Sequence, residues 1–238
     1  MRLEGRNALV TGSSQGIGQS IAMRLASEGA NVVVHYRSHP ETGEETAESI
    51  RVLGRKSKAI YADLGNVTEV QALVAQAIET LGSLDILVNN AGLEKKAAFV
   101  DVTEADYDLV MNVNLKGTFF ATQAFARHVS SRAGSGKIIN ISSVHEDLPF
   151  PNFTAYCASK GGLKMVTRNL SIELAPLGIT INNIAPGAIE TPINAKLLND
   201  PVLLKTLLGN IPLARLGKPA DVAGVAAFLA SADADYIT

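Results

Sequence analysis

The sequence has a single cysteine, Cys157, and no large excess of either charge. One cysteine cannot form a disulfide within the chain, which is typical of proteins from reducing compartments. Lys and Arg number 21 against 23 Asp and Glu, a net charge of −2, so no basic field favours a nucleic-acid partner. No apolar run approaches the roughly 20 residues that span a bilayer, and no signal-peptide hydrophobic stretch is seen. We therefore expect a soluble, cytoplasmic protein without nucleic-acid or membrane partners.

What the chain does contain is a regular alternation of short β-branched segments and longer helical patterns. The strand-like segments are residues 7–10, 32–36, 59–62, 85–88, 137–141 and 180–184, and the helical ones are 16–28, 41–53, 67–81, 103–129, 154–177, 194–208 and 219–230. Thr103 is expected to cap its helix, with Asp106 in the first turn. Continuous apolar strands that are each followed by a helix indicate a parallel sheet covered on both faces. With no linker between them, we predict one α/β domain over residues 1–238.

Glycines cluster where the first strand meets the first helix, in Thr11-Gly12-Ser13-Ser14-Gln15-Gly16-Ile17-Gly18. Glycines there let the backbone turn tightly and approach a pyrophosphate, which the helix N-terminus attracts. A glycine-rich turn can also serve purely local structure. Its position after the first strand of an alternating α/β pattern favours dinucleotide binding.

The end of the second strand bears on which dinucleotide binds. An NAD site usually places a carboxylate on the ribose diol about 20 residues after the glycines. Here the segment reads His35-Tyr36-Arg37-Ser38, and the first acidic residue is Glu41. No carboxylate repels a 2′-phosphate, and Arg37 would pair with one, although an arginine on a solvated loop is an equal alternative. The sequence favours NADP and leaves NAD open as a second cofactor.

Tyr156 and Lys160 lie four residues apart in a predicted helix and therefore share one face. Ionising a phenol of pKa about 10 near pH 7 takes roughly 4 kcal/mol, which one ammonium about 4 Å away supplies at an effective dielectric of 20. The pair is a sufficient general acid/base if it converges in a cleft. Ser143 ends the fifth strand, where ligands gather in parallel sheets. Each feature alone is common, as a surface pair or a turn serine, so their occurrence together carries the prediction.

Together these motifs resemble the short-chain dehydrogenase/reductase family. The resemblance runs from about Leu3 to Thr238 and includes the glycine motif, Asn89-Asn90-Ala91-Gly92, Ser143, Tyr156, Lys160 and Pro186-Gly187. It implies an α/β fold of the Rossmann type, with a doubly wound parallel sheet flanked by helices. It also implies that Tyr156 transfers the proton and that Lys160 lowers the pKa of that tyrosine and holds the nicotinamide ribose. Ser143 would then orient the reacting oxygen, and Asn114 would support a water-mediated proton relay.

The same resemblance assigns the dinucleotide contacts. Asp63 would accept a hydrogen bond from the adenine amino group, Asn90 and Gly92 would border the adenosine ribose, and Thr191 would reach the nicotinamide amide or the pyrophosphate. The expected cofactor residues are Gly12, Ser14, Gln15, Gly16, Ile17, Gly18, Arg37, Ser38, Asp63, Leu64, Asn90, Ala91, Gly92, Tyr156, Lys160, Pro186, Gly187, Ile189 and Thr191. Asn89 is expected to tie strands together instead. The histidines are scattered, so no metal site is predicted.

Within the family, several segments resemble the bacterial glucose 1-dehydrogenases, among them residues 89–94, 142–146 and 182–195. This implies NAD(P)-dependent oxidation of D-glucose at C1 to gluconolactone, with Tyr156 as general base. A sugar pocket needs several polar groups, and the candidates are Glu94, Ser143, His145 and Asn194, for which a role in stabilising loops is equally open. One alternative is a 3-oxoacyl thioester (acyl-carrier-protein) reductase. Another is a non-catalytic dinucleotide-binding regulator, since fold does not fix function.

Members of the family usually continue past Thr238 into a last strand. Either the sequence is shortened at this point or, as the fold prediction has it, the sheet lacks this strand. The resemblance also implies a homo-oligomer, commonly a tetramer, and the contacts that the family builds with its C-terminus are then in question.

Overall fold

The computed structural model describes residues 1–132, 134–192 and 200–238, which are built around one parallel β-sheet. Its strands are β1 (Asn7–Val10), β2 (Asn31–Tyr36), β3 (Ser57–Tyr61), β4 (Ile86–Asn89), β5 (Gly136–Ile141) and β6 (Ile179–Ile184). Their order is β3-β2-β1-β4-β5-β6, and every neighbouring pair is parallel. The order reverses between β1 and β4, where ligands bind in doubly wound sheets. The predicted fold class is confirmed, with six strands in the part of the chain that the structure describes.

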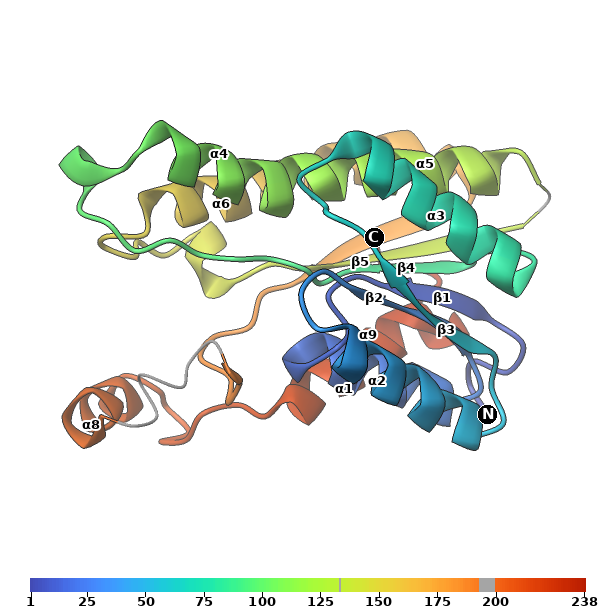
Figure 1. Cartoon of the computed structure of the whole chain (residues 1–238), viewed down its shortest axis with the longest axis horizontal. Coiled ribbons are helices and arrows are strands. Elements are labelled where there is room, and N and C mark those ends of the chain that lie inside the picture. The colour runs from blue at the N-terminus through green and yellow to red at the C-terminus, as the bar shows by residue number, and fades with distance from the viewer. Residues whose placement is uncertain (133, 193–199) are drawn as a thin grey trace.

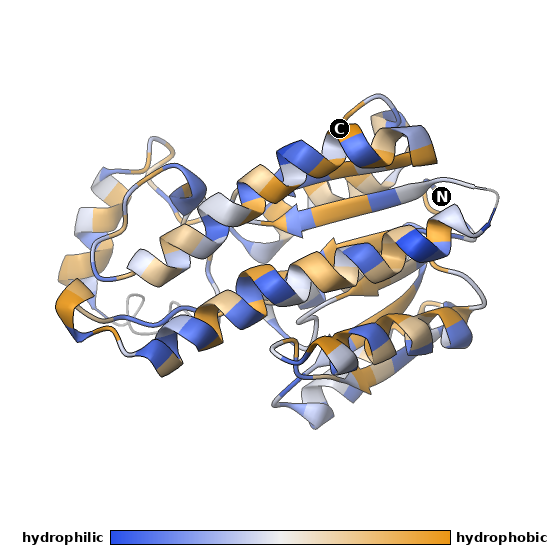
Figure 2. Cartoon of the chain, turned by 90° about the horizontal axis from the view of Figure 1, so that it is seen from above, coloured by the Kyte–Doolittle hydropathy of each residue, from blue (hydrophilic) through white to orange (hydrophobic). Residues whose placement is uncertain are grey.

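Helices cover both faces of the sheet (Figure 1). One face carries α3 (Val67–Leu81), α4 (Glu104–Met111), α5 (Thr118–Ser130) and α6 (Thr154–Leu174), and the other carries α1 (Gly16–Ser27), α2 (Pro40–Val52) and α9 (Pro219–Ala230). Strand residues alternate between two cores: Ala8 and Val10 pack with α1 and α9, whereas Leu9 packs with α3 and α5. Both sides of β1, β2, β4 and β5 are largely buried, which explains their continuous apolar runs, whereas the edge strands β3 and β6 are partly exposed. In Figure 2 the strands are accordingly mostly orange, while the helices carry both colours.

Capping side chains mark where three helices begin. Asn66, Thr103 and Asp200 each accept a hydrogen bond from a first-turn backbone N–H, in α3, α4 and α8 (Pro201–Gly209) respectively. The predicted cap at Thr103 is confirmed, because its hydroxyl accepts from Asp106 N at 3.1 Å. In contrast, α1 begins after Gln15 without any side-chain cap. Its first N–H groups are therefore left for another partner.

The helix predicted over residues 103–129 is interrupted by a six-residue π-helix, η2 (Asn112–Gly117). Such bulges add one residue to a turn and are frequent at functional sites. The apolar spacing did not reveal it, because a single wide turn shifts the pattern by only one position. The helix predicted over residues 194–208 appears as α8, and residues 193–199 lie outside the described residues. The helix predicted over residues 154–177 ends as α-helix at Leu174 and continues as the 3-10 turn η4 (Ala175–Leu177).

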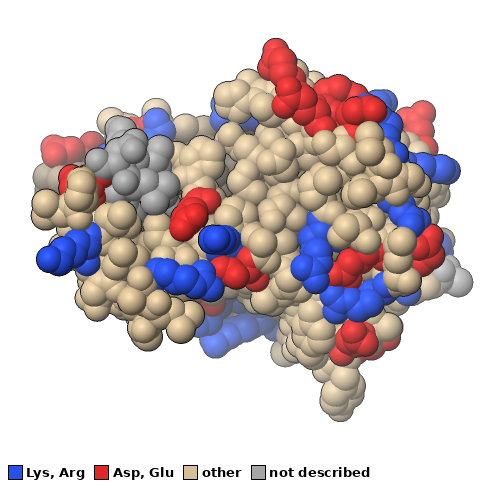
Figure 3. All heavy atoms as spheres, turned by 90° about the horizontal axis from the view of Figure 1, so that it is seen from below, with Lys and Arg blue, Asp and Glu red and all other residues tan. Residues whose placement is uncertain are grey.

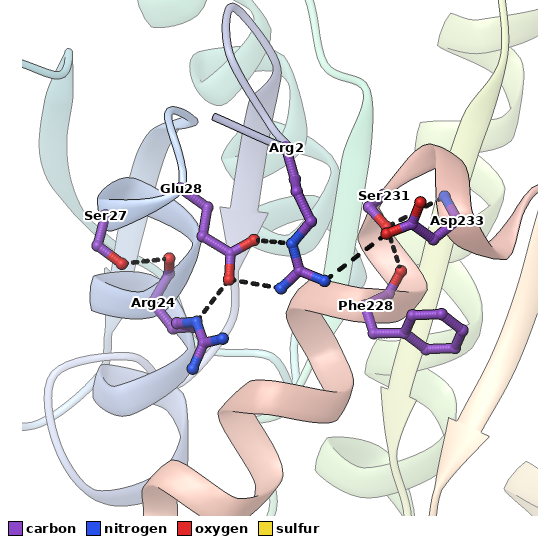
Figure 4. A network of polar contacts seen from close by, with 7 residues as sticks. All are labelled: Arg2, Arg24, Ser27, Glu28, Phe228, Ser231 and Asp233. Carbon is purple, nitrogen blue, oxygen red and sulfur yellow. Dashed lines mark hydrogen bonds and ion pairs between the residues drawn. The ribbon is translucent and has the colours of Figure 1, made fainter.

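Ion pairs join the N-terminal segment to α1 and to the 3-10 turn η6 (Ala232–Ala234) that follows α9 (Figure 4). Arg2 donates to Glu28 at 2.8 and 2.7 Å, and Arg24 donates to the same carboxylate at 2.6 Å. Arg2 also lies 3.8 Å from Asp233. Exposed pairs of this kind contribute little to stability. On the face shown in Figure 3, basic and acidic side chains similarly lie side by side, so no field of one sign extends across it.

Among the residues that the structure describes, no helix has both the length and the apolar character that crossing a bilayer requires.

Candidate active site

The glycine loop leaves the end of β1 and enters α1 in a very tight turn. Gly12 has a φ of +62°, and a Cβ on Gly18 would lie 2.3 Å from the Gly12 carbonyl oxygen and 2.4 Å from Asn90 Nδ2. No side chain therefore fits at Gly18. The first turn of α1 has neither a capping side chain nor an acidic residue. Uncapped N–H groups at the positive end of a helix, approached by bare backbone, fit the pyrophosphate of a dinucleotide.

Thr11 and Asn90 hold this loop against the end of β4. The Thr11 hydroxyl accepts from the backbone N–H groups of Asn90 (3.0 Å) and Ala91 (3.1 Å). In return, Asn90 Nδ2 donates to the carbonyls of Thr11 (2.9 Å) and Gly12 (3.0 Å). The Asn90 side chain thus positions the glycine loop from within the protein, a role that the motif alone did not indicate.

Arg37 and Asp63 face each other beyond the ends of β2 and β3. Arg37 Nε lies 3.7 Å from Asp63 Oδ2, and both side chains are partly exposed. The Asp63 carboxylate also accepts from Gly65 N at 2.9 Å, so the turn before α3 fixes its position. The two residues that the sequence assigned to the adenosine end are therefore brought together, a cation beside an acceptor.

The segment after β6 returns to the glycine loop. Val144 N donates to the Pro186 carbonyl at 3.1 Å. Further along, a Cβ on Gly16 would lie 3.7 Å from the Thr191 methyl group, so Thr191 contacts the start of α1. Thr191 thus lies beside the proposed pyrophosphate site, where the sequence placed it.

Tyr156, Lys160 and Ser143 converge at the carboxyl end of β5. Lys160 is buried in α6, and its Nζ donates to the Ile141 carbonyl at 2.9 Å and lies 5.6 Å from the centre of the Tyr156 ring. Ser143 precedes the 3-10 turn η3 (Val144–Glu146) and hydrogen-bonds the phenol closely enough to lower the pKa of Tyr156. A proton donor and acceptor, a cation and a hydroxyl therefore share one site, which is the constellation needed for acid/base catalysis at an alcohol or carbonyl.

The expected lowering of the Tyr156 pKa by Lys160 stays a prediction, and in the chain alone burial acts in the opposite direction. Burial raises the pKa of Tyr156, and this outweighs the hydrogen bond from Ser143; the charge of Glu94 raises that pKa further. Burial likewise lowers the pKa of Lys160 to about 8, against the opposing charge of Glu146. The reason is desolvation, which disfavours the charged form of both groups.

Asn114 connects the π-helix η2 to α6, the helix that contains Tyr156 and Lys160. Its Oδ1 accepts from Leu93 N at 2.9 Å, and its Nδ2 donates to the Leu93 carbonyl at 2.8 Å and to Ser159 Oγ at 3.1 Å. Ser159 Oγ in turn donates to the Tyr156 carbonyl at 2.7 Å. A Cβ on Gly92 would lie 3.4 Å from Asn114 Oδ1 and 3.7 Å from Lys160 Nζ, so the predicted relay residue and the lysine meet at one point.

Glu94, His145 and two phenylalanines surround the phenol on the other side. The His145 ring stacks on Phe150 with centres 4.2 Å apart, and Phe150 stacks on Phe153 with centres 4.1 Å apart. The His145 and Tyr156 rings meet edge to face, with centres 6.5 Å apart. Burial raises the pKa of Glu94, and the charge of His145 opposes that shift. The structure therefore brings Glu94, Ser143 and His145 together, whereas Asn194 lies outside the described residues.

A row of buried amides crosses the sheet behind these residues. Asn89 Nδ2 donates to Asn140 Oδ1 at 2.9 Å, Asn140 Nδ2 donates to Asn183 Oδ1 at 3.2 Å, and Asn183 Nδ2 donates to Glu146 Oε2 at 3.2 Å. The three asparagines are in register on β4, β5 and β6. We call Asn89, Asn140 and Asn183 the asparagine row. The sequence predicted the linking role of Asn89 but missed the other two, although an asparagine at or near the end of three successive strands is a visible signal.

The described residues include no group of three or more His, Cys, Asp or Glu that could hold a metal ion.

Comparison with known proteins agrees with this site. Residues 12–238 match the family model described as "Enoyl-(Acyl carrier protein) reductase". The chain is 42% identical to the 3beta-hydroxysteroid dehydrogenase 1 of Eggerthella lenta over 236 residues, 99% of this chain and 90% of that protein. It is 41% identical to the glucose 1-dehydrogenase 2 of Bacillus subtilis over 237 residues, 99% of this chain and 92% of that protein.

A solved structure is equally similar. The gluconate 5-dehydrogenase of Burkholderia cenocepacia, determined in complex with NADP and tartrate, superposes with a TM-score of 0.93 at 38% identity and covers 100% of this chain and 92% of that one. The fold and the site together define an NAD(P)-dependent oxidoreductase. The chain belongs to the short-chain dehydrogenase/reductase family.

Proposed function

We propose that this oxidoreductase converts D-glucose to gluconolactone by oxidation at C1. The observation that carries the proposal is the placement of Glu94 and His145 around the Tyr156 phenol, because a partly buried carboxyl and an imidazole are groups that bind sugar hydroxyls. The 41% identity to a Bacillus subtilis glucose 1-dehydrogenase supports the same substrate.

In this reaction Tyr156, Ser143 and Lys160 have different roles at C1. The C1 hydroxyl gives its proton to the Tyr156 oxygen, while the Ser143 hydroxyl donates a hydrogen bond to the same reacting oxygen. Lys160, with a pKa of about 8, is a cation at neutral pH and lies 5.6 Å from the centre of the Tyr156 ring. Acceptance of the hydride from C1 is the chemistry that a bound nicotinamide would supply. Because burial raises the pKa of Tyr156, a rise in pH favours oxidation, and the protonated phenol favours the reverse reduction.

We propose NADP as the favoured cofactor, with NAD as the second, on the position of Arg37. Its guanidinium lies beside Asp63, where the sequence places the adenosine end, and is partly exposed and available to a 2′-phosphate. Replacement Arg37→Ala is expected to raise the Kd for NADP about 10- to 100-fold, the equivalent of one charge-assisted hydrogen bond. The Kd for NAD serves as the control and should stay unchanged. An equal loss for both dinucleotides would contradict the assignment.

The thioester reductase is the second candidate function, and the helix α8 favours it. None of the described residues of α8 is buried, and its Val202 and Leu203 side chains are 74% and 54% exposed. An exposed apolar helix suits a long acyl chain better than a sugar. The description of the matching family model also names an acyl-carrier-protein thioester, although for the reduction of an enoyl group and not of a 3-oxo group. A pure dinucleotide-binding regulator would not need Ser143, Tyr156 and Lys160 to converge, so their arrangement supports catalysis.

A substrate panel followed by dinucleotide absorbance separates these candidates. D-glucose, gluconate, a 3β-hydroxysteroid and an acetoacetyl thioester are compared by kcat/KM with both dinucleotides. Glucose is expected to be the best substrate, and Glu94→Gln should raise its KM about tenfold with dinucleotide affinity unchanged. Turnover of the thioester or the steroid without any turnover of glucose would overturn the sugar assignment.

We further propose that the chain assembles into a homotetramer that uses the outer face of α5 and α6. A groove of about 530 Å³ lies there, lined by residues that include Phe119, Arg127, Leu170 and Glu173. Ile172, on α6, is 77% exposed. Exposed apolar groups of this kind mark protein interfaces. Light scattering should show that Ile172→Glu lowers the molecular mass; an unchanged mass would argue against this face. The cytoplasmic location stays a prediction from the sequence.

A further inference from the structure

His35 in β2 is a buried imidazole that contacts two separate parts of the dinucleotide site. The Gly12 backbone N–H donates to His35 Nδ1 at 2.8 Å, and His35 Nε2 lies 3.0 Å from the Ala62 carbonyl oxygen. The backbone of the same residue is bonded to Ser13, with Ser13 N donating to the His35 carbonyl at 3.0 Å and His35 N donating to Ser13 Oγ at 3.1 Å. One side chain therefore links the glycine loop to the residue that precedes Asp63.

These contacts decide which ring nitrogen carries the proton. A backbone N–H can only donate and a carbonyl oxygen can only accept. Nδ1 must therefore present its lone pair to Gly12, and Nε2 must carry the hydrogen that Ala62 accepts. The ring is neutral in this arrangement. A second proton, on Nδ1, would point at the Gly12 N–H and replace a hydrogen bond with two opposed donors.

The charged side chains near His35 lie beyond the ends of β2 and β3 and not in the glycine loop. The loop residues 11–18 carry no ionisable side chain. Beyond β3, Asp63 raises the pKa of His35 by its charge, and Arg37, beyond the end of β2, is paired with Asp63. Burial is the larger effect and lowers the pKa of His35 below its ordinary value. The neutral ring is therefore the resting form at neutral pH.

We propose that His35 is a positioning residue that joins the pyrophosphate and adenosine ends of the dinucleotide site, so that adding a proton to its ring weakens dinucleotide binding. The proton breaks the bond to Gly12 and leaves the bond to Ala62, and the glycine loop loses its attachment to the end of β3. The cofactor site is thereby sensitive to acid. The proposal rests on dinucleotide binding and is independent of the sugar.

The first test compares the native chain with His35→Asn by calorimetric titration of NAD⁺ from about pH 8 to about pH 5. NAD⁺ is chosen because it lacks the phosphate monoester of NADP, whose own pKa is about 6. As the pH falls and His35 takes up a proton, the Kd of the native chain for NAD⁺ is expected to rise, toward about tenfold per pH unit. The Kd of the variant is expected to stay constant, because its amide cannot take up a proton. His39, His128 and His145 are present in both chains, so their titration contributes equally to the pH dependence of both Kd values. Equal pH dependence in the two chains would overturn the proposal.

The second test needs no substitution and decides the matter if the variant does not fold. Nitrogen NMR of the native imidazoles should show His35 neutral with the hydrogen on Nε2. Because coupling between two binding events is reciprocal, saturating NAD⁺ should lower the pKa of His35 further. A hydrogen on Nδ1, or a His35 pKa that NAD⁺ leaves unchanged, contradicts the proposal. Neither measurement involves glucose, so a wrong substrate assignment would not affect the result.

Discussion

The two halves of the sheet hold their functional loops in different ways. Around β1–β3, the glycine loop is held by backbone contacts, by one buried imidazole and by the side chains of Thr11 and Asn90, and a bare Gly18 lets the backbone close up. Around β4–β6, side-chain amides do this work: the asparagine row spans the strands, and Asn114 holds the segment before Glu94. A loop that is expected to bind phosphate with its N–H groups must keep side chains off the face that it presents. A half that places a phenol, a hydroxyl and a cation must orient them with other side chains.

The strongest test of this division removes the phenol oxygen alone. Tyr156→Phe should lower kcat by about 10²- to 10⁴-fold, because the proton then has no acceptor. The Kd for NAD⁺ should stay within a few-fold, since the glycine half is untouched. Steady-state kinetics and dinucleotide titration on the same preparation measure both. A large loss of dinucleotide affinity would show that the two halves are not separable.

The next effect concerns the asparagine row. Asn140→Leu removes hydrogen bonds to Asn89, Asn183 and Thr167 and leaves buried polar groups without partners. The free energy of unfolding should fall by about 2–4 kcal/mol, as measured by urea denaturation. Asn169→Leu is the matched control, because the one bond that the Asn169 side chain makes within the described residues is to the exposed Glu173 on the same helix. If the two variants have the same free energy of unfolding, the asparagine row does not stabilise the β4–β6 half of the sheet.

A smaller effect is expected in the glycine half. Gly18→Ala places a methyl group 2.3 Å from the Gly12 carbonyl oxygen, so the loop must move away from α1. The Kd for NAD⁺ should rise about tenfold, which corresponds to the loss of about one charge-assisted hydrogen bond to the dinucleotide. Gly209→Ala is the control, because a Cβ there meets nothing within 4 Å. An unchanged Kd for Gly18→Ala would mean that the loop can shift without loss.

The smallest effect is a pH dependence of stability that comes from Lys160. Its pKa is about 8 in the folded chain against 10.5 ordinarily, so between these values the unfolded chain binds the extra proton and stability rises with pH. Lys160→Met should remove this contribution and, near pH 7, stabilise the fold by about 1 kcal/mol while abolishing activity, because a buried cation is lost. Thermal unfolding of both chains across that range measures the difference. A destabilised variant at pH 7 would indicate that the bond to the Ile141 carbonyl outweighs the desolvation.

The sequence predicted most of what depends on local pattern. Continuous apolar segments placed the strands, and strand-end and i,i+4 positions placed Ser143, Tyr156 and Lys160 together. The hydrogen bond from the Asn90 amide to the Gly12 carbonyl could not be predicted, because the two residues lie 78 positions apart and only the folded sheet brings them together. The raised pKa of Tyr156 was missed for a related reason. Spacing reports the distance to Lys160, but desolvation depends on what the rest of the chain packs around the phenol.

The π-helix η2 has a consequence for how this site can be lost. It holds one residue more than a regular helix would need between α4 and α5, and Asn114 lies within it. Deleting one residue of η2 would let the wide turn close into regular α-helix, so that α4 and α5 keep their faces while the side chains within the turn are redirected. We expect such a one-codon deletion to leave an intact glycine loop beside a misdirected asparagine, turning a catalyst into a dinucleotide carrier in a single genetic event.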